Sequence, residues 1–214
     1  ISITENEPAK IDSLAYEGID SIDDQLRKQY FAKASMKTGE NFSVEKLIAE
    51  RDRTMLFFRE EGYAFMHEDS IRIKVDTVGS NAGVLYRIKL PEKLIYGPIN
   101  DIVHNPVKTD TKSREKRFVE DGIQGVIFGK QNMVPTLITS SVAFRPGQVT
   151  KASLEQKTLQ NFGKTNVFSS IGIRPDSVRD GKLYSTIHLE PAPKHQIEPK
   201  LLVDNRYGAL FFGA

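Results

Sequence analysis

The sequence repeats one small plan of secondary structure twice, and this repeat limits the chain to a tandem architecture. An amphipathic helix is predicted between Gly39 and Gly62, and a second one, about two turns shorter, between Gly147 and Gly163. Each helix is followed by two segments in which apolar and polar residues alternate, the pattern of a half-buried strand. With 214 residues in all, each copy has enough chain to bury a modest core.

The first copy is predicted to run strand, helix, helix, strand, strand. A short strand is expected over 10–19 and a short helix over 23–35, where Asp23 and Asp24 suit a helix N-terminus. The hairpin that closes the copy has one arm over 71–76 and the other over 84–90, joined by a loop at 79–83.

The second helix of this copy carries the strongest local signal. Ser43 suits its N-cap, and Gly62 suits the position just after its end. Its apolar residues are predicted to lie mainly on one buried face: Val44, Leu47, Ile48, Met55, Leu56 and Phe58.

The second copy follows a related plan with an insertion. A first strand over 96–103, broken by Pro98, precedes a charged loop at 108–117 of mixed sign. The remaining predicted elements, in chain order, are an extra strand over 123–128, a helix over 136–144, a helix over 154–162 stopped by Gly163, a strand over 167–173, a loop over 175–181 and a last strand over 183–189.

Composition excludes several classes of site. The chain has no Cys, which rules out disulfides, thiolate metal ligands and thiol nucleophiles. The formal net charge is only +2, too small to form a phosphate-binding surface unless it is clustered. No apolar run reaches the roughly 20 residues of a membrane-spanning helix. The chain opens with Ile1 rather than Met, so we interpret it as a piece of a longer protein.

No cofactor or metal site is predicted, and no catalytic residue. The four histidines (His67, His104, His188 and His195) have no metal-ligand spacing, and Asp20, Asp23 and Asp24 do not fit a calcium loop. Ser140 and Ser141 lack a nucleophile elbow, and Gly122, Gly125 and Gly129 form no phosphate-binding loop. One basic cluster could meet anionic lipid or nucleic acid, but interleaved acids favour a solvated loop: Lys108, Lys112, Arg114, Lys116 and Arg117.

Several stretches resemble POTRA domains. The motif FRPGQ (144–148) before the second helix resembles the POTRA domain. The stretch 158–194, which begins TLQNFGKTNVFSSIGIRPDS and ends GKLYSTIHLEPAPK, resembles the last POTRA domain before the barrel in BamA/TamA-family outer-membrane proteins. The stretch FSVEKLIAERDRTMLFFREEGYAF (42–65), followed by IRIKVDT (71–77), resembles the preceding POTRA domain, especially in TamA-like members. The resemblance covers about 10–194, and the insertion departs from it.

The resemblance implies an α+β fold of tandem POTRA-like β-α-α-β-β domains, each a three-stranded mixed sheet packed on two helices. Residues 1–9 would end a preceding POTRA domain or form a linker, and 10–93 would be one POTRA-like domain. Residues 94–194 would be the last one before the barrel, with its insertion at about 107–130. Residues 195–214 would begin the outer-membrane barrel, with strands at 200–204 and 209–212.

The resemblance also implies a non-enzymatic role in the periplasm and at the outer membrane. The domains would receive unfolded outer-membrane or surface proteins and periplasmic accessory proteins, and pass clients to a C-terminal β-barrel; no nucleic-acid partner is expected. Open sheet edges would bind extended segments by β-augmentation. The partner-binding residues carried over to this sequence lie on the strand after the second helix of each copy: Ile71, Arg72, Ile73, Lys74, Val75, Phe168, Ser169, Ile171 and Ile173.

Other functions remain open at this point. The periplasmic part of a two-partner secretion transporter has a similar layout of two POTRA domains, but a plug-like helix is not recognisable in the sequence. An α/β enzyme with an unrecognised site would need a deep pocket with convergent polar groups. A nucleic-acid binder would need aromatic residues on the sheet face, where Arg72, Lys74 and Asp76 are expected instead.

Overall fold

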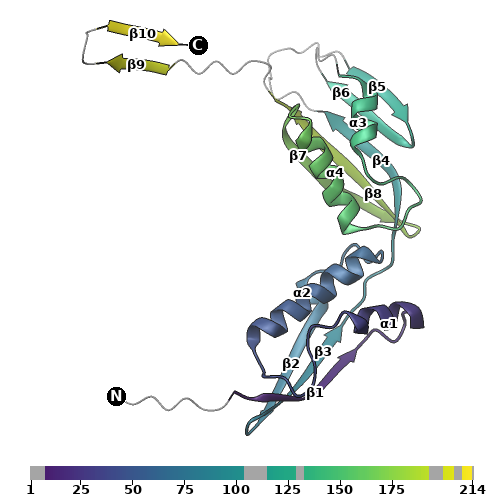
Figure 1. Ribbon diagram of the computed structural model, residues 1–214. Coiled ribbons are helices and arrows are strands. Elements are labelled where there is room, and N and C mark those ends of the chain that lie inside the picture. Colours follow the sequence, from purple (N-terminus) through teal and green to yellow (C-terminus); the bar gives the residue numbers. More distant parts are fainter. Residues whose placement is uncertain (1–7, 104–114, 129–132, 193–199, 205–208, 214) are drawn as a thin grey trace.

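The computed structural model describes residues 8–103, 115–128, 133–192, 200–204 and 209–213. The first part of the chain, called here the N-terminal unit, contains two helices and a sheet (Figure 1). Its elements are β1 (Lys10–Glu17), α1 (Asp24–Ala32), α2 (Val44–Glu60), the short 3-10 helix η1 (Glu68–Ser70), β2 (Ile71–Val78) and β3 (Asn81–Ile88). The predicted order of elements is confirmed.

The sheet of the N-terminal unit has the strand order β1-β3-β2. β1 runs parallel to β3 and β2 antiparallel to it, so the sheet is mixed. Every second residue of β3 is buried against the helices, as the alternation predicts, and Arg87 and Leu85 lie on the other face. The core joins β1, β2 and β3 to both helices, and its fully enclosed side chains include Ile11, Tyr30, Phe58 and Tyr86.

Local sequence signals explain both helices of this unit. The Asp23 carboxylate accepts a hydrogen bond from the Leu26 amide, and the Ser43 hydroxyl accepts one from the Lys46 amide, so each helix begins at its predicted cap. α2 ends at Glu60, and Gly62 follows with a φ of 101°, a conformation that favours glycine.

The predicted buried face of α2 was partly wrong. Leu47, Phe57 and Phe58 are buried, but Val44, Ile48 and Leu56 are exposed by 56%, 43% and 54%. The buried positions also include the polar residues Glu50 and Thr54. Apolar spacing predicted the position of the helix correctly, but it assigned the buried face without these two polar residues. A polar side chain can be buried in a core when it has hydrogen-bond partners inside the protein.

The second part of the chain, the C-terminal unit, repeats this plan around a larger sheet. Its elements are β4 (Ile95–Val103), β5 (Glu115–Glu120), β6 (Ile123–Phe128), α3 (Pro135–Ser141), α4 (Ala152–Lys164), β7 (Phe168–Arg179) and β8 (Lys182–Pro191). The predicted charged loop at 108–117 was wrong at its end, since β5 begins at Glu115; residues 104–114 lie outside the described part. The extra strand predicted over 123–128 is confirmed.

The sheet of the C-terminal unit has the order β5-β6-β4-β8-β7. Its last three strands repeat the β1-β3-β2 arrangement, because β4 is parallel to β8 and β7 is antiparallel to β8. The α+β class is therefore confirmed for both units, but this sheet has five strands rather than the predicted three. The difference comes from the insertion, whose hairpin adds β6 in parallel to β4.

Three local predictions in the C-terminal unit were wrong. α4 continues through Gly163, and the positive φ after this helix belongs to Asn166. β4 is not broken at Pro98 but shifts its register between Tyr96 and Ile99. The predicted loop over 175–181 is mostly strand, since β7 extends through Pro175 to Arg179.

One further hairpin lies near the C-terminal end of the chain. β9 (Lys200–Asp204) and β10 (Ala209–Gly213) pair as antiparallel strands, which agrees with the strands predicted there. Residues 1–7, predicted to end a preceding domain or form a linker, lie outside the described residues. None of the helices in the described ranges combines the length and apolar character needed to cross a membrane.

Candidate strand-pairing edges

The first strand of the N-terminal unit is partly covered by the chain itself. The Ile11 amide donates a hydrogen bond to the Glu40 carbonyl at 2.9 Å, and the Gly39 amide donates to the Ile11 carbonyl at 2.7 Å. The Phe42 amide donates to the Ala9 carbonyl at 2.7 Å. The segment between the two helices therefore occupies the outer side of β1 at the start of this strand.

The first strand of the C-terminal unit is covered more completely. β6 pairs with β4 along the register from Ile99–Ile123 to Val103–Ile127. Within the described residues, β2 and β7 each pair with a strand on one side only. In both units, the strand that follows the second helix thus forms an edge of its sheet, on the same side of the molecule (Figure 1).

The free backbone groups of β2 belong to its apolar residues. The Lys89 amide donates to the Ser70 carbonyl at 2.8 Å, while Ile71 stands opposite Ile88. Ser70 is thus hydrogen-bonded to the residue that follows β3, and in an antiparallel pair only every second residue of a strand makes such bonds to its partner. The amides and carbonyls of Ile71, Ile73 and Val75 therefore point away from β3. The Ile71 amide accordingly donates to the Glu68 carbonyl of η1. Ile73 and Val75 are left facing the edge.

The apolar residues of β7 also turn their backbone groups outward, and Pro175 shows which residues these are. Pro175 stands opposite Ser185 in register, and proline has no amide hydrogen to donate to β8. Proline is tolerated in an edge strand where the missing N–H would face solvent. The register is regular from Ser170 to Pro175, so Ile171 and Ile173 share the outward orientation of Pro175.

One flank of α2 carries exposed apolar residues and is turned toward the residue that precedes β2. Arg51 forms an ion pair with Glu68, directly before β2, at 3.4 Å. Val44 and Ile48 lie seven and three residues before Arg51, hence on the same helical face. The other flank faces α1, where an Arg53 nitrogen donates to the Tyr30 carbonyl. The exposed Val44 and Ile48 therefore lie on the flank of α2 that is turned toward Glu68 rather than toward α1, and on β2 itself Val75 is 39% exposed.

The remaining predicted partner-binding residues occupy less accessible positions. Arg72 and Lys74 turn their backbone toward Arg87 and Leu85 of β3, so only their side chains are exposed. Phe168 is 9% exposed and packs edge-on against a core phenylalanine of α4. The Ser169 hydroxyl donates to the Glu190 carbonyl at 3.2 Å, at an irregularity of the β7–β8 pairing.

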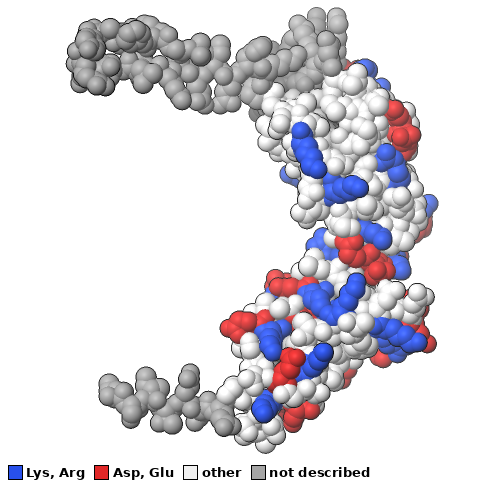
Figure 2. Space-filling model, viewed as in Figure 1, with Lys and Arg blue, Asp and Glu red and all other residues white. Residues whose placement is uncertain are grey.

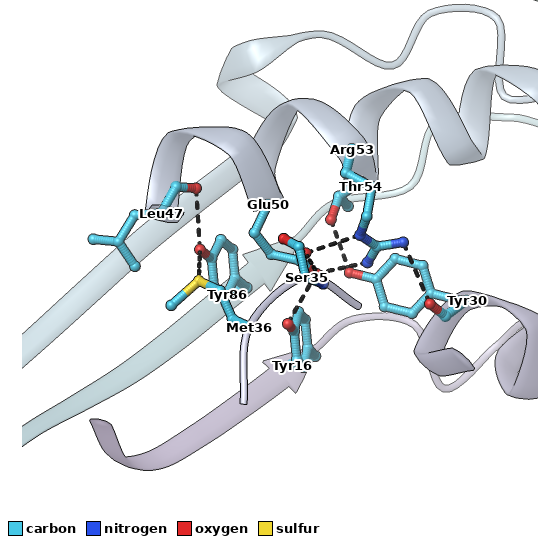
Figure 3. A network of polar contacts seen from close by, with 9 residues as sticks. All are labelled: Tyr16, Tyr30, Ser35, Met36, Leu47, Glu50, Arg53, Thr54 and Tyr86. Atoms are coloured by element: carbon cyan, nitrogen blue, oxygen red, sulfur yellow. Dashed lines mark hydrogen bonds and ion pairs between the residues drawn. The ribbon is translucent and has the colours of Figure 1, made fainter. Parts of the chain in front are cut away.

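A buried polar network holds the N-terminal unit together, and sequence reasoning missed it (Figure 3). The Glu50 side chain is 0% exposed. Two nitrogens of Arg53 donate to its two oxygens at 2.6 and 2.8 Å. The Tyr16 hydroxyl donates to Oε1 at 2.9 Å, and the Ser35 amide and hydroxyl donate to Oε2 at 2.9 and 2.7 Å. The network joins β1, α2 and the segment after α1.

The electrostatics of this network are those of a satisfied ion pair. Burial raises the pKa of Glu50, but the hydrogen bonds from Arg53 and Ser35 outweigh it and hold the pKa below its usual range. Burial and the Glu50 charge raise the pKa of Tyr16, and the Arg53 guanidinium lies 4.5 Å from the Tyr30 ring centre. Each oxygen of Glu50 is occupied by donors from the protein, so this carboxylate acts as a structural cross-link.

The other candidate residues of the sequence do not converge. His67 is the N-cap of η1, and Asp23 caps α1 as expected, whereas His104 and His195 lie outside the described residues. In the described ranges, three or more potential metal ligands are nowhere grouped together. Positive and negative side chains are interspersed over the visible surface (Figure 2), and Arg117 of the basic cluster pairs with Glu115 at 2.8 Å.

Comparison with known proteins supports the fold. Neither a protein-family model nor a curated protein matches the sequence. BamA from Haemophilus ducreyi lacking POTRA domains 1–3 aligns with a TM-score of 0.53 at 8% identity, covering 87% of this chain and 30% of that one. POTRA1–2 of Omp85 from Anabaena gives 0.48 at 8% identity over 88% of this chain and 96% of that one. CdiB from Acinetobacter baumannii gives 0.32 at 12% identity over 90% and 31%.

The chain thus spans less than a third of the BamA chain that it matches. At this identity the similarity establishes fold alone. It agrees with the internal arrangement described above, in which β1-β3-β2 of one unit recurs as β4-β8-β7 of the other, each with two helices. The two units have the fold of POTRA domains.

Proposed function

We propose that this chain is the periplasmic POTRA region of an outer-membrane protein assembly or secretion factor, and that it acts without catalysis. In this role it binds extended segments of unfolded client proteins, or of accessory proteins, and presents them to a β-barrel of the outer membrane. The observation that carries the proposal is the edge position of β2 and β7 in two sheets of POTRA fold.

The chemistry of the edges supports extended polypeptide as the ligand. An edge strand offers a row of amides and carbonyls that pair with any backbone, which suits clients of diverse sequence. On β2 the outward groups belong to Ile73 and Val75, and Val44 and Ile48 are exposed on the flank of α2 that is turned toward Glu68, directly before β2. An incoming strand would therefore find backbone partners and an apolar surface for every second side chain.

The covered first strands support the choice of edge. β4 is paired with β6, and the start of β1 is bonded to the segment between the helices. A visiting strand cannot use positions that the chain already occupies. Unprotected edges invite aggregation, and natural proteins commonly block them. In each unit the strand after the second helix therefore stays open to a visiting strand, whereas β1 is bonded at its start and β4 lies inside its sheet, with β5 as the other edge strand.

The test compares two substitutions at one position of β2. Val75→Pro removes the outward amide hydrogen without removing a hydrogen bond to β3, whereas Val75→Thr keeps this amide and nearly the same shape. The probe is an unfolded outer-membrane β-barrel protein diluted from urea, and its binding to the chain is measured by light-induced crosslinking from a photoreactive residue at Lys74.

Backbone pairing predicts that Val75→Pro loses most of the crosslink and that Val75→Thr retains it, with circular dichroism confirming that both variants are folded. Equal crosslinking by both variants would contradict docking at this edge. Loss in both variants would assign binding to the valine side chain rather than the backbone, and would also contradict β-augmentation. The same pair of changes at Ile173 tests β7.

The two-partner secretion transporter remains the second candidate. The open edges would serve the same kind of ligand in either setting, so the crosslinking experiment tests the shared step.

A further inference from the structure

The two units meet where the end of α2 approaches the start of α4 (Figure 1). Glu60 is the last residue of α2, and its carboxylate binds Ser153 of α4 through both oxygens. The Ser153 amide donates to Oε1 at 2.6 Å, and the Ser153 hydroxyl donates to Oε2 at 2.6 Å. These contacts join residues that are 93 positions apart in the sequence.

α4 has no capping side chain of its own. Lys151 occupies its N-cap position and makes no side-chain cap hydrogen bond. Ser153 is the second residue of the helix, and the amide at this position is one that an N-cap side chain normally satisfies. The Glu60 carboxylate takes over that task from the other unit, and its negative charge lies at the positive end of the helix dipole.

A second set of contacts fixes the junction from within. The Gly62 carbonyl accepts hydrogen bonds from the Leu94 amide at 2.8 Å and from the Thr150 hydroxyl at 3.1 Å. Thr150 is only 1% exposed, and its amide donates to the Leu94 carbonyl at 3.1 Å. A Cβ at Gly62 would lie 2.8 Å from a methyl group of Val149, so the close approach depends on glycine.

We propose that these contacts form a locked elbow, in which Glu60 caps α4 in trans and the Gly62 carbonyl binds both the linker and Thr150. The lock holds the two sheets, and with them the β2 and β7 edges, in one fixed relation. Units joined by a short linker otherwise move relative to each other by default. The lock is built into the chain and is present whether or not a client is bound.

The experiment measures the spread of distances between the units in the complete chain. Because the sequence contains no Cys, Lys28→Cys on α1 and Lys116→Cys on β5 place two spin labels at exposed sites without background. Pulsed electron paramagnetic resonance then gives the distance distribution. The locked elbow predicts one narrow peak for the parent and a peak at least about twofold broader for Glu60→Ala, since free units would sample many orientations.

The matched control is Glu61→Ala, which removes the next carboxylate along the chain. Among the described residues, Glu61 makes no hydrogen bond or ion pair to the C-terminal unit, so the parent width is expected. A Glu60→Ala peak as narrow as the parent's would overturn the proposal, and so would equal broadening by Glu61→Ala. If Glu60→Ala alters the circular dichroism spectrum, Thr150→Val replaces it: broadening supports the lock and an unchanged width overturns it.

Discussion

Removal of the Arg53 guanidinium is expected to destabilise the N-terminal unit strongly. Arg53→Met keeps the apolar stem of the side chain but deletes both hydrogen bonds to Glu50, whose carboxylate is 0% exposed. Breaking a buried ion pair from one side costs about 3–5 kcal/mol, because the remaining charge is left uncompensated. A whole domain is commonly stable by only about 5–15 kcal/mol, so this loss would be a large fraction of the total.

A second substitution tests whether charge is the cause. Glu50→Gln added to Arg53→Met removes the stranded charge, while the amide oxygen can still accept from Ser35 and the amide nitrogen can donate to the Tyr16 oxygen. We therefore expect the double variant to recover at least half of the lost stability. Hydrogen exchange measured by mass spectrometry reports the unfolding free energy over 10–88, and the residues 133–192 of the same molecule serve as the internal control.

The pH dependence gives an independent reading of the same prediction. In the parent, the ionised Glu50 carboxylate stabilises the folded state at pH values above 4.5, the ordinary pKa of a glutamate. This stabilisation is lost as the pH falls below 4.5 and through the lowered pKa of Glu50. In Arg53→Met, the carboxylate is buried without the guanidinium, so the pKa of Glu50 is expected to rise. The deficit, which is the stability that the variant lacks relative to the parent, should therefore shrink as the pH is lowered toward 4.5. A deficit below about 1 kcal/mol at neutral pH would refute the reasoning, as would a deficit that grows on acidification.

Two further predictions concern a glycine in the N-terminal unit and a carboxyl group near the junction. Gly18→Ala should lower the free energy of unfolding, measured by thermal unfolding, by more than about 2 kcal/mol, because the new Cβ would lie 1.9 Å from the Ile88 carbonyl oxygen. Gly39→Ala is the control: Gly39 has a similar φ but open space around it, so the loss should be only about 1 kcal/mol. Equal losses in the two variants would contradict the steric argument. Burial raises the pKa of Glu155, so the stability that its protonated carboxyl group contributes is lost as the pH rises through this raised pKa. Glu155→Gln should therefore raise the melting temperature at pH 8, by an amount that vanishes toward pH 4.5. A difference in melting temperature that does not depend on pH would contradict this prediction.

Much of the fold could be predicted from local patterns. The caps at Asp23 and Ser43, the glycine after α2 and the alternation of β3 each act within a few residues, so the sequence displays them directly. The repeat of the same plan indicated two units of one kind. Pro175 was misread as a loop signal, because a proline in an edge strand has the same local appearance as one in a turn.

The sequence by itself determined the order of the elements in the N-terminal unit and most of those in the C-terminal unit, where β5 was not predicted. Only the tertiary structure decided which sheet edges stay open, because this depends on where the inserted hairpin and the segment between the helices add their hydrogen bonds. The same holds for the Glu50 network and for Glu60 at the start of α4, which join residues 34 and 93 positions apart. Periodicity is a property of neighbouring residues, whereas such pairings arise only when packing brings distant segments together.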